Sequence, residues 1–499
     1  MCPCLAAFND RTGLTELRAM ENNRSETDFM GTRVIPADAY WGIHTLRAAE
    51  NFPITGTPIS AYPALVKALA QVKHAAVLAN FDLGLIDGVK KDAIVRACED
   101  IEQGGLLEQF VVDVIQGGAG TSTNMNANEV IANRALEHLN LAKGEYSMIH
   151  PNGDVNLGQS TNDVYPTALK IACILGAHEL LTAMAHLRQA FERKAVAFDD
   201  VVKVGRTQLQ DAVPMTLGQE FSTYAVMVDE DEQRIREAMV HLHEINLGAT
   251  AIGTGINTHP HYAAQARGHL RRISGLPLVT AGNLVEATQD CGAFVLFSGT
   301  LKRVAVKLSK ICNDLRLLSS GPRAGFAEIN LPPRQAGSSI MPGKVNPVIP
   351  EVVNQIAFEV IGNDLTVTLA AEAGQLQLNA FEPIIARSLF ASLAHLTAAC
   401  TTLADHCIGG ITANKEFLRS QVEASIGVVT ILNPLIGYET ATSIARQALA
   451  TGRSVTSLVL ERGLLTDFEL DEILRPEHMA NPQGHDGELD SISSTIGFD

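Results

Sequence analysis

A regular spacing of large apolar residues past the middle of the chain restricts the possible folds more than any other feature. From Phe294 to Leu315, such residues recur at alternating intervals of three and four positions. They are Phe294, Phe297, Leu301, Val304, Leu308, Ile311 and Leu315. This heptad pattern is typical of long helices that pack side by side. We therefore predict a helix over about 284–317, roughly 50 Å long at 1.5 Å per residue.

Similar apolar periodicity predicts further helices on both sides of this one. Their expected ranges are 63–80, 88–104, 128–139, 166–199, 216–246, 350–373 and 381–405. Hydrophobic residues make up 46% of the chain and aromatic residues only 5%, which favours packed helices over an all-β sandwich. We therefore expect a mainly all-α protein with a central bundle of about five long helices. Bundles of this length usually bury faces against sister subunits, so we also expect an oligomer.

A chain of 499 residues is long enough for two or three domains. We predict an N-terminal domain over 24–159, a central long-helix bundle over 160–414 and a small helical domain over 415–475. Residues 1–23 are expected to be an N-terminal extension. Residues 476–499 are rich in polar residues, proline and glycine and are expected to be a disordered tail.

The charge and cysteine content exclude several classes of partner. The formal charge is −17, from 38 basic and 55 acidic residues, which argues against nucleic acid or an anionic membrane as a partner. No apolar run approaches the roughly 18 residues that span a bilayer. The first twenty residues carry charges where a secretion signal would be apolar. Eight scattered cysteines without a CxxC pair fit a reducing cytoplasm.

The polar segment 337–347, with the sequence GSSIMPGKVNP, is the strongest candidate for chemistry. Glycines and flanking prolines describe a loop that moves on defined hinges, as catalytic lids do. On composition alone it is equally well a connector. It is not a phosphate-binding P-loop, because five residues separate Gly337 from Gly343 and Val345 follows Lys344. Neither Ser338 nor Ser339 has a lysine three positions later, so the segment is not a Ser-x-x-Lys pair either.

Three other polar turns, at 117–126, 158–163 and 205–211, carry similar hydroxyl and amide side chains. The cations among these segments are Lys344 and Arg206. The nearby acids are Glu129, Asp163 and Asp211. Neutral donors with one firm positive charge suit a small dicarboxylate. No metal constellation is recognisable, since His150 and the His259-Pro260-His261 segment lack ligand geometry and are better explained as turn residues.

Residues 337–346 match the signature Gly-Ser-Ser-x-Met-Pro-x-Lys-x-Asn at every fixed position, and the chain is identified as a member of the fumarase/aspartase superfamily. The resemblance extends over about residues 24–475. It implies a three-domain, mainly α-helical fold. It also implies a homotetramer in which each active site draws its polar turns from three subunits. Members of this superfamily eliminate an amine or water across a Cα–Cβ bond and release fumarate. The resemblance implies that no cofactor is required; a divalent metal such as Mg²⁺ activates some relatives.

The resemblance also implies a role for each polar residue. Ser338 corresponds to the general base, acting as an alkoxide. The residues that correspond to ligands of the β-carboxylate are Thr121, Ser160, Thr161 and Ser339. Those that correspond to ligands of the α-carboxylate are Thr207, Lys344 and Asn346, and Gln208 is also expected to bind the substrate. Asn162, with Thr121, corresponds to the contacts of the amino group.

The reaction within the superfamily is suggested first by the residue at position 208. Fumarases carry histidine after the Arg-Thr pair of the third turn, where this chain has Gln208, so elimination of ammonia from L-aspartate is favoured. Segments 312–321 and 348–354 point the same way, whereas 257–260 leans towards fumarase. The alternative is dehydration of malate to fumarate on the same fold. A member without activity, kept for a binding or structural role, is disfavoured because Ser338, Lys344 and Asn346 are intact.

Overall fold

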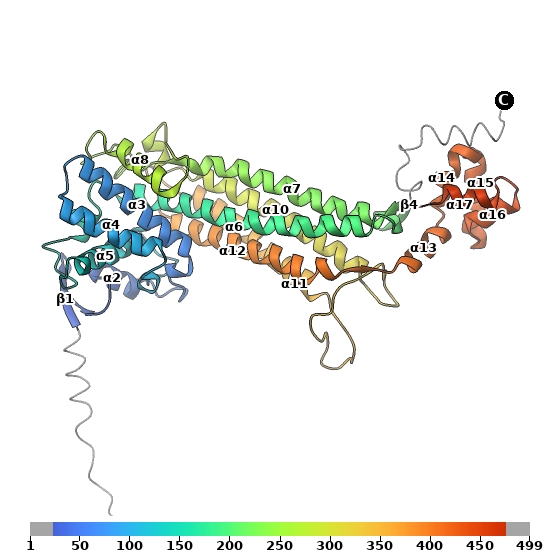
Figure 1. The fold of residues 1–499 in the computed structure, drawn as a ribbon, viewed down its shortest axis with the longest axis horizontal. Coiled ribbons are helices and arrows are strands. Elements are labelled where there is room, and N and C mark those ends of the chain that lie inside the picture. The colour runs from blue at the N-terminus through green and yellow to red at the C-terminus, as the bar shows by residue number, and fades with distance from the viewer. Residues whose placement is uncertain (1–22, 476–499) are drawn as a thin grey trace, which may run out of the picture. The chain divides into compact units, whose positions relative to one another are not determined.

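The computed structural model describes residues 23–475, which are mainly helical (Figure 1). The described residues also form four small two-stranded sheets. The predicted mainly α-helical class is therefore confirmed. The helices are α2 (Ile43–Asn51), α3 (Pro63–Asp82), α4 (Gly88–Glu102), α5 (Thr121–His138), α6 (Thr161–Ala197), α7 (Leu217–Val240), α8 (Tyr262–Ser274), α9 (Leu284–Ala287), α10 (Gly292–Leu318), α11 (Val348–Glu372), α12 (Glu382–His406), α13 (Lys415–Ala424), α14 (Val428–Ile436), α15 (Tyr438–Thr451), α16 (Val455–Glu461) and α17 (Asp467–Ile473).

The strands form three antiparallel pairs and one parallel pair, β5–β6. They are β1 (Asn23–Asp28), β2 (Gly31–Pro36), β3 (Val202–Thr207), β4 (Gln210–Thr216), β5 (Glu244–Ile245), β6 (Val279–Thr280), β7 (Ile329–Asn330) and β8 (Thr412–Ala413). The predicted tail over 476–499 and all but the last residue of the predicted extension over 1–23 lie outside the described residues.

The chain divides into two compact units, and the five long helices α6, α7, α10, α11 and α12 contribute segments to both. The first unit takes the residues up to Leu180 with Arg234–Lys302 and Glu359–His395. The second unit takes Leu181–Gln233, Arg303–Phe358 and the residues from Leu396 onward. The predicted boundaries at 24–159, 160–414 and 415–475 remain a prediction.

Polar contacts join the long helices within the first unit. Asp364 of α11 accepts hydrogen bonds from Ser298 and from Lys302 of α10, at 2.8 and 2.6 Å. Asn363, on the same helix, donates to Ser392 of α12 at 3.2 Å. Helices α10, α11 and α12 therefore lie side by side in this unit.

The second unit is joined in the same manner. Arg188 of α6 donates to the buried Glu232 of α7 at 3.0 Å. Asn354 of α11 donates to the Ser309 hydroxyl of α10 at 2.9 Å. Aromatic rings of α6 and α7 add apolar contact, with Phe191 and Tyr224 centroids 5.6 Å apart. The predicted bundle of about five long helices is thus supported by direct contacts in each unit.

The heptad residues that predicted the longest helix are all buried, with exposed fractions of 2% or less from Phe294 to Leu315. The helix itself is shorter than predicted. α9 ends at Ala287 and α10 begins at Gly292. The Asp290 carboxylate accepts from the Gly292 amide at 2.8 Å, and a side chain that captures a backbone donor in this way favours a turn over a continuous helix. The 27 residues of α10 correspond to roughly 40 Å.

The predicted start of helix α5 was also wrong, and this helix carries a predicted site residue, Thr121. The sequence predicted a helix from Asn128 to about Leu139, whereas α5 begins at Thr121. Because its first turns are polar, the sequence assigns them to the preceding glycine turn. The other long helices lie within a few residues of their predicted ranges, except that α6 begins five residues earlier and α7 ends six residues earlier than expected.

The helices α13 to α17, over 415–475, form a small core together with strand β3. Val202 and Val204 of β3 belong to the same buried apolar cluster as Val428 and Leu458. Gly427 approaches strand β4 so closely that a Cβ atom there would lie 2.1 Å from the Ala212 carbonyl oxygen. The base of the β3–β4 hairpin is therefore held against these helices.

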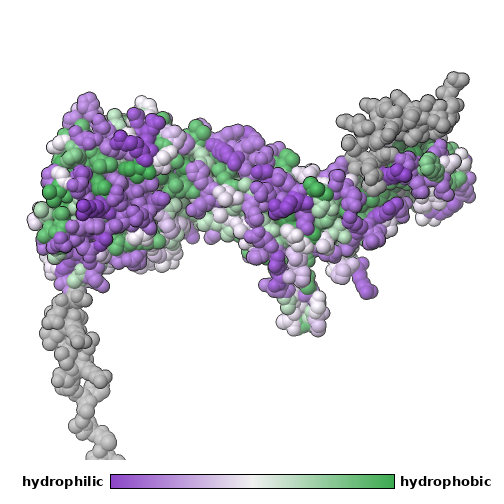
Figure 2. Space-filling view, in the orientation of Figure 1, coloured by the Kyte–Doolittle hydropathy of each residue, from purple (hydrophilic) through white to green (hydrophobic). Residues whose placement is uncertain are grey.

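Apolar residues reach the surface among the polar ones on the face shown in Figure 2. On α11, Ile361, Leu365 and Leu369 follow at helical spacing and are 38%, 59% and 60% exposed. Two stretches, Thr161–Ala197 and Glu382–Gly410, are long and apolar enough to cross a membrane by length and composition alone. This corrects the prediction that no such stretch exists. In the most apolar 18-residue part of each stretch, 67% and 56% of the residues are buried inside the protein, as in ordinary core helices.

Candidate functional site

The predicted site residues fall into two groups, one in each unit. Thr121, Ser160, Thr161 and Asn162 belong to the first unit. Thr207, Gln208, Ser338, Ser339, Lys344 and Asn346 belong to the second. Each group is gathered at the end of an element or in a turn, where side chains are available to a ligand.

Thr121 is the first residue of α5 and follows a turn that requires glycine. Gly118, Ala119 and Gly120 all have positive φ, at 91°, 55° and 86°. A Cβ atom on Gly120 would lie 2.5 Å from the ring of the buried Tyr165, so no larger residue fits there. The Thr121 hydroxyl donates to the Gly118 carbonyl at 2.7 Å, which fixes its orientation while the residue stays exposed.

Ser160, Thr161 and Asn162 lie where α6 begins. The Asn162 amide donates to the Ser160 hydroxyl oxygen at 3.3 Å, and Thr161 Oγ1 accepts from Asn124 at 3.1 Å. The Asn162 side chain donates through Nδ2 to the Ala251 carbonyl at 2.7 Å. That bond orients the Oδ1 atom of Asn162, the atom able to accept from an ammonium group.

Two of the acids noted near these turns are buried and hold the backbone. Asp163 accepts from the amides of Ser160, Gly248 and Thr250, at 3.0, 2.9 and 3.3 Å. Burial raises its pKa to about 6 against these bonds. Glu129 accepts from the amides of residues 42, 44 and 45, and burial raises its pKa to about 7. Neither acid presents itself to a ligand, because both are fully enclosed.

A buried lysine beneath the first group was not predicted. Lys73 of α3 has no exposed surface, and its ammonium donates to Asn156 Oδ1 and to Gln159 Oε1, each at 2.8 Å. Burial lowers the pKa of Lys73 to about 7. Asn156 Oδ1 also accepts from Asn124 at 3.2 Å, and Asn124 in turn bonds Thr161. The signal available in the sequence was a single charge inside the apolar segment 68–79.

Thr207 and Gln208 lie at the tip of the β3–β4 hairpin, which the sequence predicts only as a polar turn. Thr207 pairs with Gln210 across the turn. The two central residues, Gln208 and Leu209, have φ values of 55° and 63°, as a two-residue type I′ turn requires. Both predicted residues are exposed there. Asp211, the third acid noted from sequence, is also exposed on this hairpin.

The segment 337–347 forms a loop whose two ends are bonded together. The Gly337 amide donates to the Lys344 carbonyl at 2.7 Å, and Asn346 Nδ2 donates to the Gly337 carbonyl at 2.8 Å. A Cβ atom at Gly337 would lie 2.7 Å from the Lys344 carbonyl oxygen, which explains the glycine. Ser339 and Lys344 are exposed, so the loop presents a hydroxyl and an ammonium outward.

Ser338 occupies a distinctive position within this loop. Its Oγ accepts hydrogen bonds from two consecutive backbone amides, those of Ile340 at 3.2 Å and Met341 at 3.0 Å. Two N–H groups directed at one oxygen stabilise negative charge on it. Ser339 has no such pair of amide donors among the described contacts. This geometry distinguishes the two adjacent serines.

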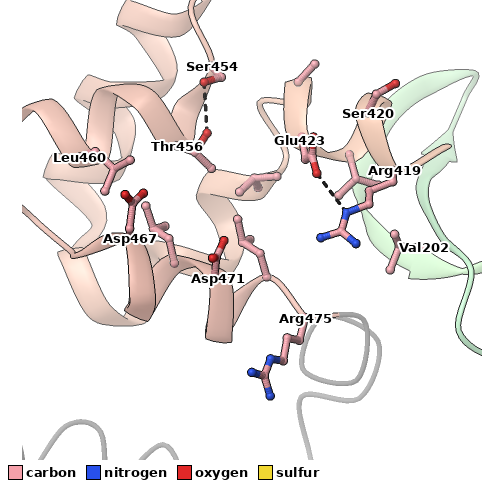
Figure 3. A pocket seen from close by; sticks show the side chains of 15 residues that line it. Val202, Arg419, Ser420, Glu423, Ser454, Thr456, Leu460, Asp467, Asp471 and Arg475 are labelled. Atoms are coloured by element: carbon pink, nitrogen blue, oxygen red, sulfur yellow. Dashed lines mark hydrogen bonds and ion pairs between the residues drawn. The ribbon is translucent and has the colours of Figure 1, made fainter. Parts of the chain in front are cut away.

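The cavities of the second unit differ in chemistry. One of about 520 Å³ is lined by Lys344 and Asn346 of the loop, and its charged lining residues are Lys344 and Arg316. Another, of about 1120 Å³, lies among the C-terminal helices and carries three acids with Arg419 and Arg475 (Figure 3). None of the predicted site residues lines the larger cavity. The smaller one suits an anion and adjoins the predicted chemistry.

Within residues 23–475 no group of three or more histidine, cysteine, aspartate or glutamate side chains could hold a metal ion. The six cysteines in that range are free thiols buried in the protein. Burial raises the pKa of each of them, including Cys98 and Cys173. They have the character of core residues rather than of nucleophiles.

The family models and the most similar relatives point to the same family of lyases. A family model described as lyase matches residues 31–362, and one described as the fumarase C C-terminus matches 428–481. An aspartate ammonia-lyase of Pseudomonas canavaninivorans is 61% identical over 92% of this chain and 97% of its own length. An aspartate ammonia-lyase of Escherichia coli (strain K12) is 55% identical over 93% and 97%.

Solved structures agree with these matches. A structure described as fumarate lyase:delta crystallin from Brucella melitensis bound to cobalt has a TM-score of 0.90 at 57% identity, covering 92% of this chain and 99% of that one. A class II fumarase from Schistosoma mansoni has a TM-score of 0.87 at 34% identity, covering 92% of this chain and all of that one. The fold is thus shared with both solved structures, and the sequence is nearer to the aspartate ammonia-lyases than to the class II fumarase.

Proposed function

Because the chain belongs to the fumarase/aspartase superfamily, we propose that it is an aspartate ammonia-lyase, a carbon–nitrogen lyase that converts L-aspartate to fumarate and ammonia. The observation that carries this is the near full-length match to aspartate ammonia-lyases at an identity well above that of the fumarase structure. Gln208, in place of the histidine of fumarases, agrees with it. Fumarate hydration is the less supported alternative.

The proposed chemistry begins at Ser338. Its alkoxide removes the proton from Cβ of L-aspartate, and the electron pair of that bond passes into the adjacent carboxylate to form an aci-carboxylate dianion. The pair then forms the Cα–Cβ double bond as the C–N bond breaks and ammonia leaves. The proton on Ser338 is returned to solvent before the next turnover. The two amides that donate to Ser338 Oγ support this role, because they stabilise the alkoxide.

Substrate binding is assigned to the polar turns. Thr121, Ser160, Thr161 and Ser339 are proposed to hold the β-carboxylate, where negative charge accumulates. Thr207, Lys344 and Asn346 are proposed to hold the α-carboxylate, with Gln208 beside them. Asn162 is proposed to accept from the substrate ammonium through Oδ1, consistent with the use of its Nδ2 on Ala251. Local donors are needed because the chain as a whole is acidic.

The two groups of site residues belong to different units, and we propose a homotetramer in which subunits complete each other's sites. The exposed apolar residues Ile361, Leu365 and Leu369 on α11 support burial of this helix against another copy. We propose that no cofactor is required and that a divalent metal such as Mg²⁺ acts only as an activator. A cytoplasmic location is proposed from the free cysteines in the described residues.

A single assay tests the function. The purified protein is incubated with L-aspartate, and fumarate is followed by its ultraviolet absorbance, with L-malate in parallel and with both reactions repeated in a chelator. Fumarate from L-aspartate is expected in each case. Fumarate from L-malate alone would replace the proposal with the hydratase alternative, and loss of activity in chelator would overturn the metal assignment.

A further inference from the structure

A buried carboxylate outside the predicted site forms ion pairs with two positively charged side chains. Glu328 has no exposed surface. Its Oε2 lies 2.8 Å from the Lys203 ammonium, and its Oε1 forms an ion pair with the Arg206 guanidinium. Lys203 also pairs with Glu220 of α7. A carboxylate removed from water in this way is stable only while such partners remain in place.

The partners of Glu328 lie on the strand that leads to the hairpin tip. Arg206 directly precedes Thr207 in β3. Its guanidinium also lies over the ring of Phe326, 4.4 Å from the centroid. A planar guanidinium held by a carboxylate on one side and an aromatic face on the other keeps one orientation, which a lysine would not.

The hairpin needs such an anchor because its tip is strained. Gln208 and Leu209 both have positive φ, a conformation that residues other than glycine adopt at some cost. The pairing of the two strands also shifts between Val204 and Arg206. Strained turns persist where the surrounding structure fixes both ends. Arg206 lies between the register shift and the strained turn, so it can fix that end of the hairpin tip.

The backbone of Glu328 is also held by hydrogen bonds, and it precedes the loop 337–347 in the chain. Its amide donates to the Leu318 carbonyl at 2.9 Å, and its carbonyl accepts from Asn414 at 3.0 Å. The next two residues form strand β7, which pairs with β8. Ser338 follows ten residues after Glu328 in the chain. The same buried residue is therefore joined to strand β3 of the hairpin through its side chain and, through its backbone, to the segment that precedes the loop 337–347 in the chain.

From these contacts we propose that Glu328 is a positioning residue. Through Arg206 and Lys203 it holds strand β3, and with it the hairpin tip Thr207–Gln208, against the chain segment that leads to the Ser338 loop. The kinetic consequence rests on the proposed function, because it requires that Thr207 bind the substrate. The structural consequence, a hairpin held in one place by Glu328, does not depend on which substrate is used.

The kinetic test is Glu328→Gln, which keeps the side-chain size and removes the charge. A misplacement of the hairpin by about 1 Å would lower kcat/KM for L-aspartate by up to about 100-fold. We expect a rise in KM to contribute, since Thr207 is assigned to a carboxylate present in substrate and transition state alike. Arg206→Gln should reproduce the effect, and the double variant should be no worse than either single one, because the residues act as one unit.

The matched control is Glu220→Gln. It removes the other carboxylate on Lys203 and leaves the Arg206–Glu328 pair intact, so kcat/KM is expected to stay within about twofold of the wild type. Equal losses in the Glu220 and Glu328 variants would overturn the inference, since the network would then serve general stability. An unchanged KM and kcat in a folded Glu328→Gln protein would overturn the kinetic consequence, that the Glu328 network positions Thr207 for the substrate.

A measurement that needs no catalysis separates this inference from the proposed function. Hydrogen exchange of the amides in 202–216, followed by mass spectrometry without substrate, should be faster in Glu328→Gln and unchanged in Glu220→Gln. If Glu328→Gln does not fold, Arg206→Gln is measured in the same way and is expected to show the same local increase. Unchanged exchange in the folded variant refutes the positioning role, even if the wild type proves inactive on L-aspartate.

Discussion

Replacing Ser338 with alanine should abolish most of the activity while leaving the fold intact. The two amides that donate to Ser338 Oγ, from Ile340 and Met341, lie in an exposed part of the loop and can bond water instead. The cost to the free energy of unfolding should therefore not exceed about 1 kcal/mol. Deleting a general base typically lowers the rate by about 10²–10⁴-fold, or roughly 3–5 kcal/mol in the activation barrier. The catalytic loss should thus exceed the loss of stability several times over.

The assay is steady-state formation of fumarate from L-aspartate, with circular dichroism and thermal unfolding on the same samples. The loss should appear in kcat, because the proposed carboxylate ligands remain. Ser339→Ala is the matched control, since it removes a neighbouring hydroxyl without a pair of amide donors. The Ser339→Ala variant should raise the activation barrier by roughly 1–3 kcal/mol, because it removes one of several donors to the β-carboxylate. Should Ser338→Ala retain more activity than Ser339→Ala, the base has been assigned to the wrong serine.

Three further predictions follow from the site, the buried acids and the exposed helix surface. Lys344→Ala should remove detectable activity without changing helix content, because a desolvated carboxylate loses a charge partner worth roughly 2–5 kcal/mol; near-normal turnover would exclude the role. Burial raises the pKa of Glu129 to about 7 and that of Glu382 to about 8, so between about pH 5 and 7 the native state binds more protons than the unfolded state. The melting temperature should therefore fall as pH rises through this range, and Glu382→Gln should flatten the dependence in calorimetry. Light scattering should show a tetramer, and a stable, active monomer would refute the shared-site arrangement.

The long helices were predictable because their apolar residues repeat with the period of a helix. The start of α5 was not. Its first seven residues, TSTNMNA, have no apolar stripe, and Asn124 and Asn126 are buried through hydrogen bonds instead. A polar network that fills an interior position leaves no hydrophobic period to detect. The same polarity that pointed to ligand binding therefore hid the helix that presents Thr121.

The β3–β4 hairpin was missed for a related reason. Two-residue hairpins are usually recognised by Asn-Gly or a similar pair at the turn, because both central residues need positive φ. Here the turn is Gln208-Leu209, which carries no such signal. The alternation of Val202 and Val204 was visible, but it is too short to distinguish a strand from a helix end. Thr207 and Gln208 were thus identified by motif while their supporting structure was not.

The residues that support the proposed site are harder to find from sequence than those proposed to bind the substrate. Ser338, Lys344 and Asn346 are close together in sequence, so one motif contains them. Lys73 is 83 and 86 residues from its partners, and Glu328 is 122 residues from Arg206. No local pattern records such a pairing. What the sequence does show is a charge among apolar neighbours, and a buried charge is tolerated only where distant partners satisfy it. In this chain, isolated charges of that kind are the positions at which to look for residues that support the proposed site.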